Sequence, residues 1–217
     1  MATLDKMTKL NDYLSGFWKI AYLNLLWFAF SLLGLFLFGI GPATYAMTKY
    51  YDRWFRLKEE PPVFQTFWQY YQERFKQTVA ISWIQGIILA VLVFNIFNVT
   101  AWFLQVTNVL MLVIFLVGST HLYNVMAALT YETIREIAQA SMMMGLGYLH
   151  YTIILWTIVL GVYYLLSITY SSLLLLFGIG FMGAAIAFTG TRIIADFESD
   201  GKKDEENIKN ILKGESK

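Results

Sequence analysis

The stretch NLLWFAFSLLGLFLFGIGPATYAMTKYY, residues 24–51, decides the fold of this chain. Residues 20–48 contain no charged side chain, and this run is longer than the about 20 residues that a helix needs to cross a bilayer core. Gly39, Gly41 and Pro42 interrupt it, and proline fits the first turn of a helix, where its missing N–H would have no partner. The stretch therefore predicts a membrane-spanning helix, an elbow at these three residues, and a second helix.

The composition extends this interpretation to the whole chain. Of the 217 residues, 58% are hydrophobic and only 14% are charged, against about 25% charged in typical soluble domains. Residues 77–131 and residues 137–191 hold no charged side chain, so each segment has room for two spans and a short turn. We therefore predict an all-α polytopic membrane protein with one transmembrane domain, residues 1–191, and a charged cytoplasmic tail, residues 192–217. The five predicted spans cover approximately residues 18–38, 78–98, 102–129, 148–166 and 172–191.

Two segments between the first and second spans are amphipathic. Residues 43–57 mix aromatic side chains with Lys49, Arg53 and Arg56, a combination suited to the headgroup layer of a membrane. Residues 64–76 carry an aromatic stripe at helical spacing and are expected to run straight into the second span. We expect both segments to form amphipathic surface helices on the cytoplasmic side.

The distribution of basic residues predicts an orientation. With five spans, Lys6, Lys9 and Lys19 lie on the amino-terminal side, and all the other basic residues lie on the opposite side. Because basic loops remain in the cytoplasm, we expect the amino terminus outside and the carboxyl terminus in the cytoplasm.

Several polar side chains fall inside the predicted spans. One interpretation is that they form hydrogen bonds between helices, and the other is that they line a groove for a partner or a polar path. Apart from Lys19 at the edge of the first span, no Asp, Glu, Lys or Arg lies in a predicted span, which counts against an ion-driven transporter. The residues in question are Asn24, Trp27, Gln85, Asn108, His121 and Asn124.

The fifth span contains a row of small residues, Gly180, Gly183, Ala184 and Ala187. Small residues four apart allow helix backbones to approach closely in a membrane. This helix-packing face is expected to contact other helices of the chain or, alternatively, another membrane protein.

The sequence offers little for catalysis. It has no cysteine, which excludes disulfides and thiolate metal sites. His121 and His150 are the only histidines, and their spacing matches no metal motif. We therefore expect no enzyme activity, no cofactor, no metal and no nucleic acid partner.

Three motifs resemble the YesL family of small membrane proteins, found mainly in Firmicutes. They are NLLW at residues 24–27, GIGPAT at residues 39–44 and FWQYYQERFKQ at residues 67–77. Members of this family lie near genes for carbohydrate ABC importers and glycan-degrading enzymes. The resemblance therefore implies a bacterial cell membrane protein that assists oligosaccharide uptake, with no catalytic residues to transfer.

These observations lead to one preferred function and two alternatives. The preferred hypothesis is an auxiliary subunit of a carbohydrate ABC importer, which binds the permease rather than catalysing a reaction. The alternatives are a small stand-alone transporter or facilitator, and a membrane sensor or scaffold for the sugar response. For the elbow, we expect Gly41→Val to harm assembly if Gly41 requires a positive φ.

Overall fold

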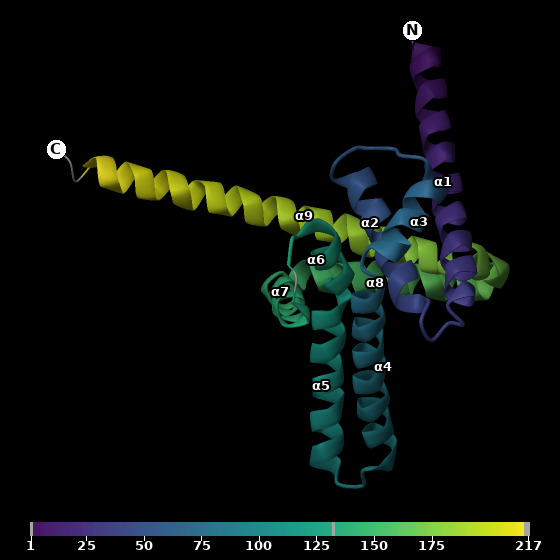
Figure 1. The fold of residues 1–217 in the computed structure, drawn as a ribbon, viewed down its shortest axis with the longest axis vertical. Helices are drawn as coiled ribbons and strands as arrows, with labels where there is room; N and C mark the ends of the chain where they lie inside the picture. Colours follow the sequence, from purple (N-terminus) through teal and green to yellow (C-terminus); the bar gives the residue numbers. More distant parts are fainter. Residues whose placement is uncertain (1, 132, 215–217) are drawn as a thin grey trace.

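A computed structural model describes residues 2–131 and 133–214, with side chains described between residues 14 and 197 (Figure 1). The described residues fold into helices joined by short connections. The helices are α1 (Ala2–Leu33), α2 (Ile40–Phe55), α3 (Val63–Glu73), α4 (Phe75–Asn98), α5 (Trp102–Thr120), α6 (Leu122–Ala128), α7 (Ile134–Gly147), α8 (Leu149–Thr169) and α9 (Ser171–Gly214).

Five segments of the described chain are long and apolar enough to cross a membrane, which confirms the prediction of an all-α, multi-pass membrane protein. The third is interrupted at His121, which separates α5 from α6. The fifth belongs to α9, which continues as one helix to Gly214 through most of the predicted tail. Residues 215–217 of that tail lie outside the described residues. The candidate spans are Leu14–Leu33, Phe75–Asn98, Trp102–Ala128, Leu149–Thr169 and Ser171–Phe197.

The helices fall into a packed body and a projecting hairpin. In Figure 1, α4 and α5 lie side by side and extend away from the remaining helices, whereas α9 lies across their direction. Only 6% of the most apolar part of each hairpin segment is buried inside the protein. The long flanks of this hairpin are therefore left to lipid or to a partner.

Helix α2 lies at the centre of the packed body, where α1, α3, α4, α6 and α9 all contact it. Tyr45, Tyr50 and Tyr51 are at most 1% exposed. The expectation that this helix lies on the surface is therefore wrong. Its aromatic residues suit a headgroup layer, but the surrounding helices cover them, and α3 supplies carboxylate and hydroxyl partners for its cations.

Helix α2 runs antiparallel to α1. Trp27 in α1 donates a hydrogen bond from Nε1 to Thr44 Oγ1 at 3.0 Å near the start of α2. At the other end, Lys19 Nζ lies 2.6 Å from Glu60 Oε2, just beyond α2. The chain after the elbow therefore returns to the level of Lys19. With five spans, Lys19 and the connection from α2 to α3 would lie on opposite sides of the membrane, whereas the structure places them in contact.

The reversal between α1 and α2 occupies residues 34–39. Positive φ angles occur at Leu35 (53°) and Phe36 (59°), and among the described residues no glycine has one. Gly41 therefore does not meet the condition, a positive φ, on which the Gly41→Val prediction was based. Gly41 is needed for a different reason, because a Cβ there would overlap the carbonyl oxygen of Thr78 in α4.

Pro42 lies in the first turn of α2, as the sequence predicts. Gly39 is the residue that precedes this helix, and a Cβ at Gly39 would lie 2.5 Å from the carbonyl oxygen of Ser31. The elbow residues thus combine a helix start with two close backbone approaches.

The connections on either side of the hairpin differ from the sequence interpretation. Helix α3 does not run straight into α4, because Arg74 leaves the helical conformation with φ −124° and ψ 35°. Residues 134–147, which fall between the third and fourth predicted spans, form α7. Thr133 and Glu136 build a capping box at its start, in which each side chain pairs with the other residue's backbone N–H.

The close approach at Gly41 is testable with Gly41→Val in detergent-solubilised protein. Valine would push α4 away from α2, and overpacking of this kind costs about 1–3 kcal/mol, so we expect a lower temperature of thermal unfolding. Gly86→Val is the matched control, since a Cβ at Gly86 meets no atom within 4 Å. Equal unfolding temperatures for the two variants would show that α2 and α4 are not in this contact.

Candidate functional site

Asn24 connects α1 to α9 at a buried position, where its side chain is 2% exposed. Its Nδ2 donates to the carbonyl oxygens of Leu176 at 2.8 Å and Leu175 at 3.1 Å. Its Oδ1 accepts from the backbone N–H of Gly180 at 2.9 Å. The amide therefore bridges the C=O of Leu176 and the N–H of Gly180, which are the two groups that pair in a regular α-helix.

A second buried side chain meets the same point of α9. The Tyr51 hydroxyl in α2 donates to the carbonyl oxygen of Gly180 at 2.9 Å. A Cβ at Gly180 would lie 2.7 Å from the carbonyl oxygen of Ile20. Helices α1, α2 and α9 thus converge on Gly180, and we call Asn24, Tyr51 and Gly180 the three-helix junction.

His121 and Asn124 lie together in a second buried cluster. His121 Nε2 is 3.1 Å from Thr152 Oγ1 in α8, and its Nδ1 is 3.3 Å from Asn124 Nδ2. Asn124 also donates to the carbonyl oxygen of Ile186 in α9 at 2.9 Å. The break between α5 and α6 is therefore held to α8 and α9 by hydrogen bonds.

The other polar candidates do not join either cluster. Trp27 is buried and bonded to Thr44, as described above. Asn108 donates to the carbonyl oxygen of Leu104 in its own helix. Gln85 lies along a groove lined mainly by apolar side chains between α4, α5 and α7. The structure brings His121 and Asn124 together and leaves Asn24, Gln85 and Asn108 apart from them.

The small-residue row of α9 faces other helices of the chain. A Cβ at Gly183 would lie 2.5 Å from Met47 Cε in α2, and Ala184 and Ala187 belong to the same buried cluster as α2. Gly190 continues the row three residues after Ala187, and a Cβ there would lie 2.7 Å from Asn124 Cγ. The spacing of Gly190 is the sequence signal that could have added it to the predicted packing face.

Ion pairs and hydrogen bonds join the charged end of α2 to its neighbours. Lys49 Nζ contacts both carboxylate oxygens of Glu73 in α3, at 2.6 and 2.7 Å. Arg53 Nη1 donates to the Tyr70 hydroxyl at 2.8 Å. The hydrogen bond from Lys19 lowers the pKa of the Glu60 carboxyl below its ordinary value, so this carboxyl group is ionised at neutral pH.

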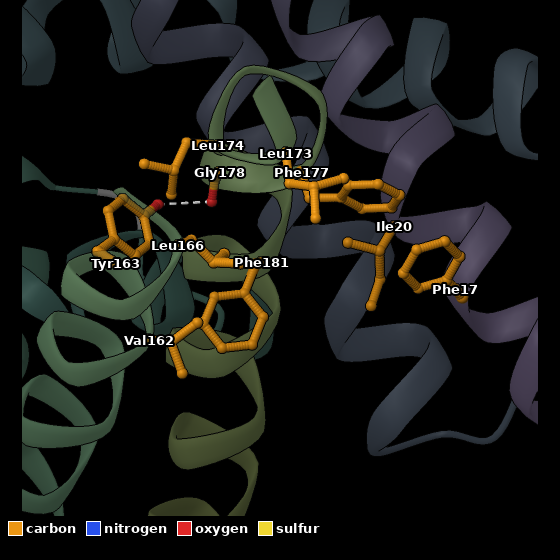
Figure 2. A pocket seen from close by; sticks show the side chains of 10 residues that line it. All are labelled: Phe17, Ile20, Val162, Tyr163, Leu166, Leu173, Leu174, Phe177, Gly178 and Phe181. Atoms are coloured by element: carbon orange, nitrogen blue, oxygen red, sulfur yellow. Dashed lines mark hydrogen bonds between the residues drawn. The ribbon is translucent and has the colours of Figure 1, made fainter. Parts of the chain in front are cut away.

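A cavity of about 210 Å³ lies between α1, α8 and α9, and Figure 2 shows the side chains that line it. Its walls are almost wholly apolar, and the one hydroxyl, on Tyr163, donates to the carbonyl oxygen of Gly178 at 2.6 Å. The cavity therefore presents hydrocarbon to an occupant and no free polar group. Its lining consists of Phe17, Ile20, Val162, Tyr163, Leu166, Leu173, Leu174, Phe177, Gly178 and Phe181.

No group of three or more metal-ligating side chains occurs in the part of the chain that the structure describes. His150 is exposed and lies against the ring of Tyr151, with a distance of 4.3 Å between ring centroids. Thr152 and Tyr51 are the polar contacts that sequence reasoning missed. Nothing local marks them, because their partners lie far away along the chain.

These features define a helical, multi-pass membrane protein in which buried polar side chains join helices. Residues 20–96, from α1 through most of α4, match the family model described as "Protein of unknown function, DUF624". Over this segment, which contains the elbow and α2, the chain is similar to that family. No solved structure matches the chain.

Three proteins of Bacillus subtilis (strain 168) are similar to the chain. Uncharacterized protein YteU is 25% identical over 169 residues, which cover 76% of this chain and 75% of YteU. Uncharacterized protein YesL is 39% identical over 80 residues, which cover 37% of this chain and 36% of YesL. Uncharacterized protein YesV is 38% identical over 77 residues, or 36% of this chain and 37% of YesV. The predicted resemblance to the YesL family is confirmed.

The three-helix junction predicts that Asn24→Leu destabilises the protein. The variant removes the amide that joins α1 to the Leu176 carbonyl and the Gly180 N–H of α9. Interhelical hydrogen bonds in membranes contribute about 1–2 kcal/mol. Asn108→Leu is the control, because its amide bonds only within its own helix. Thermal unfolding in detergent measures both variants, and an Asn24→Leu protein as stable as the Asn108→Leu protein would contradict the role of the junction.

Proposed function

We propose that the protein is an auxiliary membrane subunit of a carbohydrate ABC importer, and that it binds the permease rather than catalysing a reaction. The carbohydrate part of this proposal rests on the resemblance to the YesL family. The binding part rests on the distribution of polar and apolar side chains in the structure.

The buried polar side chains of the candidate spans support an assembly role. The Asn24 side chain and the His121–Asn124–Thr152 cluster direct their hydrogen bonds to helix backbone or to one another. Polar groups that are hydrogen-bonded in this way hold the helices together, and few polar groups then remain to bind a polar solute. We therefore favour a protein whose function depends on its surfaces.

The projecting α4–α5 hairpin is the observation that carries the proposal. It has two apolar helices with little cover from the rest of the chain, and its far end exposes Phe94, Phe97 and Trp102, of which Phe97 is 83% exposed. A lipid bilayer covers such side chains without cost, but large aromatic residues also give another helix bundle a surface to pack against. We propose that this end of the hairpin contacts the permease.

A stand-alone facilitator would need a continuous polar path. The described positions of Gln85 and Asn108, away from His121 and Asn124, do not favour that alternative. Sugar uptake by liposomes containing the purified protein alone would favour it over the subunit proposal.

Purification from native membranes in mild detergent tests the proposal. We expect an affinity-tagged protein to recover a carbohydrate ABC permease from cells grown on the oligosaccharide. Phe97→Ala should reduce that recovery, because it removes the most exposed aromatic side chain of the hairpin. Ile168→Ala, 69% exposed on α8, is the control and should leave recovery unchanged. Absence of any permease from the wild-type sample would contradict the proposal.

A further inference from the structure

We propose that α1 and α2 form a re-entrant hairpin in the membrane. Both ends of this hairpin lie at the cytoplasmic face, and its apolar turn, residues 34–39, inserts into hydrocarbon without reaching the outer face. The amino terminus is then cytoplasmic, like the carboxyl terminus, and α1 does not cross the bilayer although it is long enough to do so.

The two ends of the hairpin lie side by side. Lys19 and Glu60 form an ion pair at 2.6 Å, and a Cβ at Gly16 would lie 3.4 Å from the ring of Trp54. Gly16 and Lys19 are near the middle of α1 and near the start of its candidate span, Leu14–Leu33, whereas Trp54 and Glu60 are at and just beyond the end of α2. Whichever side of the membrane holds the start of that span therefore also holds the connection from α2 to α3.

The turn of the hairpin is apolar, and the backbone N–H groups of residues 34–38 are bonded within the chain. Leu35, Phe36, Leu37 and Phe38 are all exposed. Their backbone N–H groups nevertheless all donate to backbone carbonyl oxygens within residues 31–35. Hydrocarbon offers no hydrogen bonds, so irregular backbone survives there only when its polar groups find partners within the protein. The combination of exposed apolar side chains and hydrogen-bonded N–H groups fits insertion of the turn into lipid.

The contacts with α4 show how far along α4, and so how deep in the membrane, the turn of the hairpin lies. Trp83 Nε1 donates to the carbonyl oxygen of Leu37 at 2.9 Å, and the Trp83 ring lies 5.9 Å from the Phe38 ring. Helix α4 begins at Phe75 and ends at Asn98. At 1.5 Å per residue, Trp83 is about 12 Å from the start of α4 and about 22 Å from its end. The turn therefore stops well short of the far end of α4.

The charged end of the hairpin also meets the other charged connections. Phe55, at the end of α2, lines one cavity with Tyr151 at the start of α8 and Arg192 in α9. Arg74, between α3 and α4, donates to the carbonyl oxygen of Tyr131, between α6 and α7, at 3.0 Å. These connections consequently belong to a single face of the membrane.

A single face for the charged connections agrees with the distribution of basic residues. The turns at residues 34–39, 99–101 and 170 carry no charge, so every lysine and arginine falls on one side when α1 returns through α2. Basic residues near membrane helices mark the cytoplasmic side. In this arrangement α4 crosses the membrane and α5 with α6 crosses back, whereas α1 and α2 enter and leave at the same face.

Cysteine labelling tests this arrangement directly, because the chain has no cysteine of its own. Single variants Ala2→Cys, Lys58→Cys, Leu37→Cys and Thr100→Cys are treated in intact bacteria with a charged maleimide that does not cross membranes. Each is then treated again after permeabilisation and after denaturation in detergent. Leu35→Cys serves as a second turn variant, and each protein must elute like wild type in gel filtration.

We expect Thr100→Cys, in the turn between α4 and α5, to react in intact cells. Ala2→Cys and Lys58→Cys should react only after permeabilisation, and the turn variants only after denaturation. Reaction of Ala2→Cys in intact cells would show that α1 crosses the membrane and would overturn the proposal. Reaction of both turn variants in intact cells would place the turn at the outer face and would equally overturn it.

Discussion

The hydrogen bonds between Asn24 and α9 are the constraint on which the packed body depends. An asparagine amide within an apolar helix is costly unless it is bonded, and here both of its polar atoms are used by a helix that is more than 150 residues away along the chain. The bridge to Leu176 and Gly180 fixes the point at which α1 crosses α9. Once that crossing is set, α2 is confined between them, and Tyr51 completes the contact from the third side.

Close backbone approach is the second recurring feature of the fold. Lipid is as apolar as leucine, so helices in a membrane gain little from hydrophobic burial and rely on tight contact and hydrogen bonds. Gly41 meets the backbone of α4, Gly180 meets the backbone of α1, and a Cβ at Gly145 in α7 would lie 2.5 Å from the carbonyl oxygen of Val117 in α5. In each case a glycine permits contact between helices, and in none does it supply a left-handed backbone conformation. The left-handed positions fall instead on Leu35 and Phe36, in the turn before α2, and on Lys58, in the connection after it.

The sequence predicts where the helices lie along the chain more successfully than it predicts which helices contact one another. Charge-free length identifies the five apolar segments, and Pro42 marks the start of α2, because both signals are local. The burial of α2 was not predictable in the same way. Its aromatic and basic residues suit a headgroup layer as well as a protein interior, and only the long-range packing of α9 and α6 decides between them. The same limit applies to His121, whose partner Thr152 lies on another helix.

The central position of α2 also separates residues that serve packing from residues that are left exposed. The elbow and the small-residue row serve packing inside the chain, and the exposed α4–α5 hairpin is left for lipid or a partner.

The reactivity of a buried position on α2 tests this account most directly. Met47 is 1% exposed, whereas Lys58 lies on the surface beyond the end of α2. In detergent-solubilised protein, Met47→Cys should resist a maleimide until the protein unfolds, while Lys58→Cys reacts at once. Equal rates of reaction for the two variants in the folded protein would contradict the central position of α2.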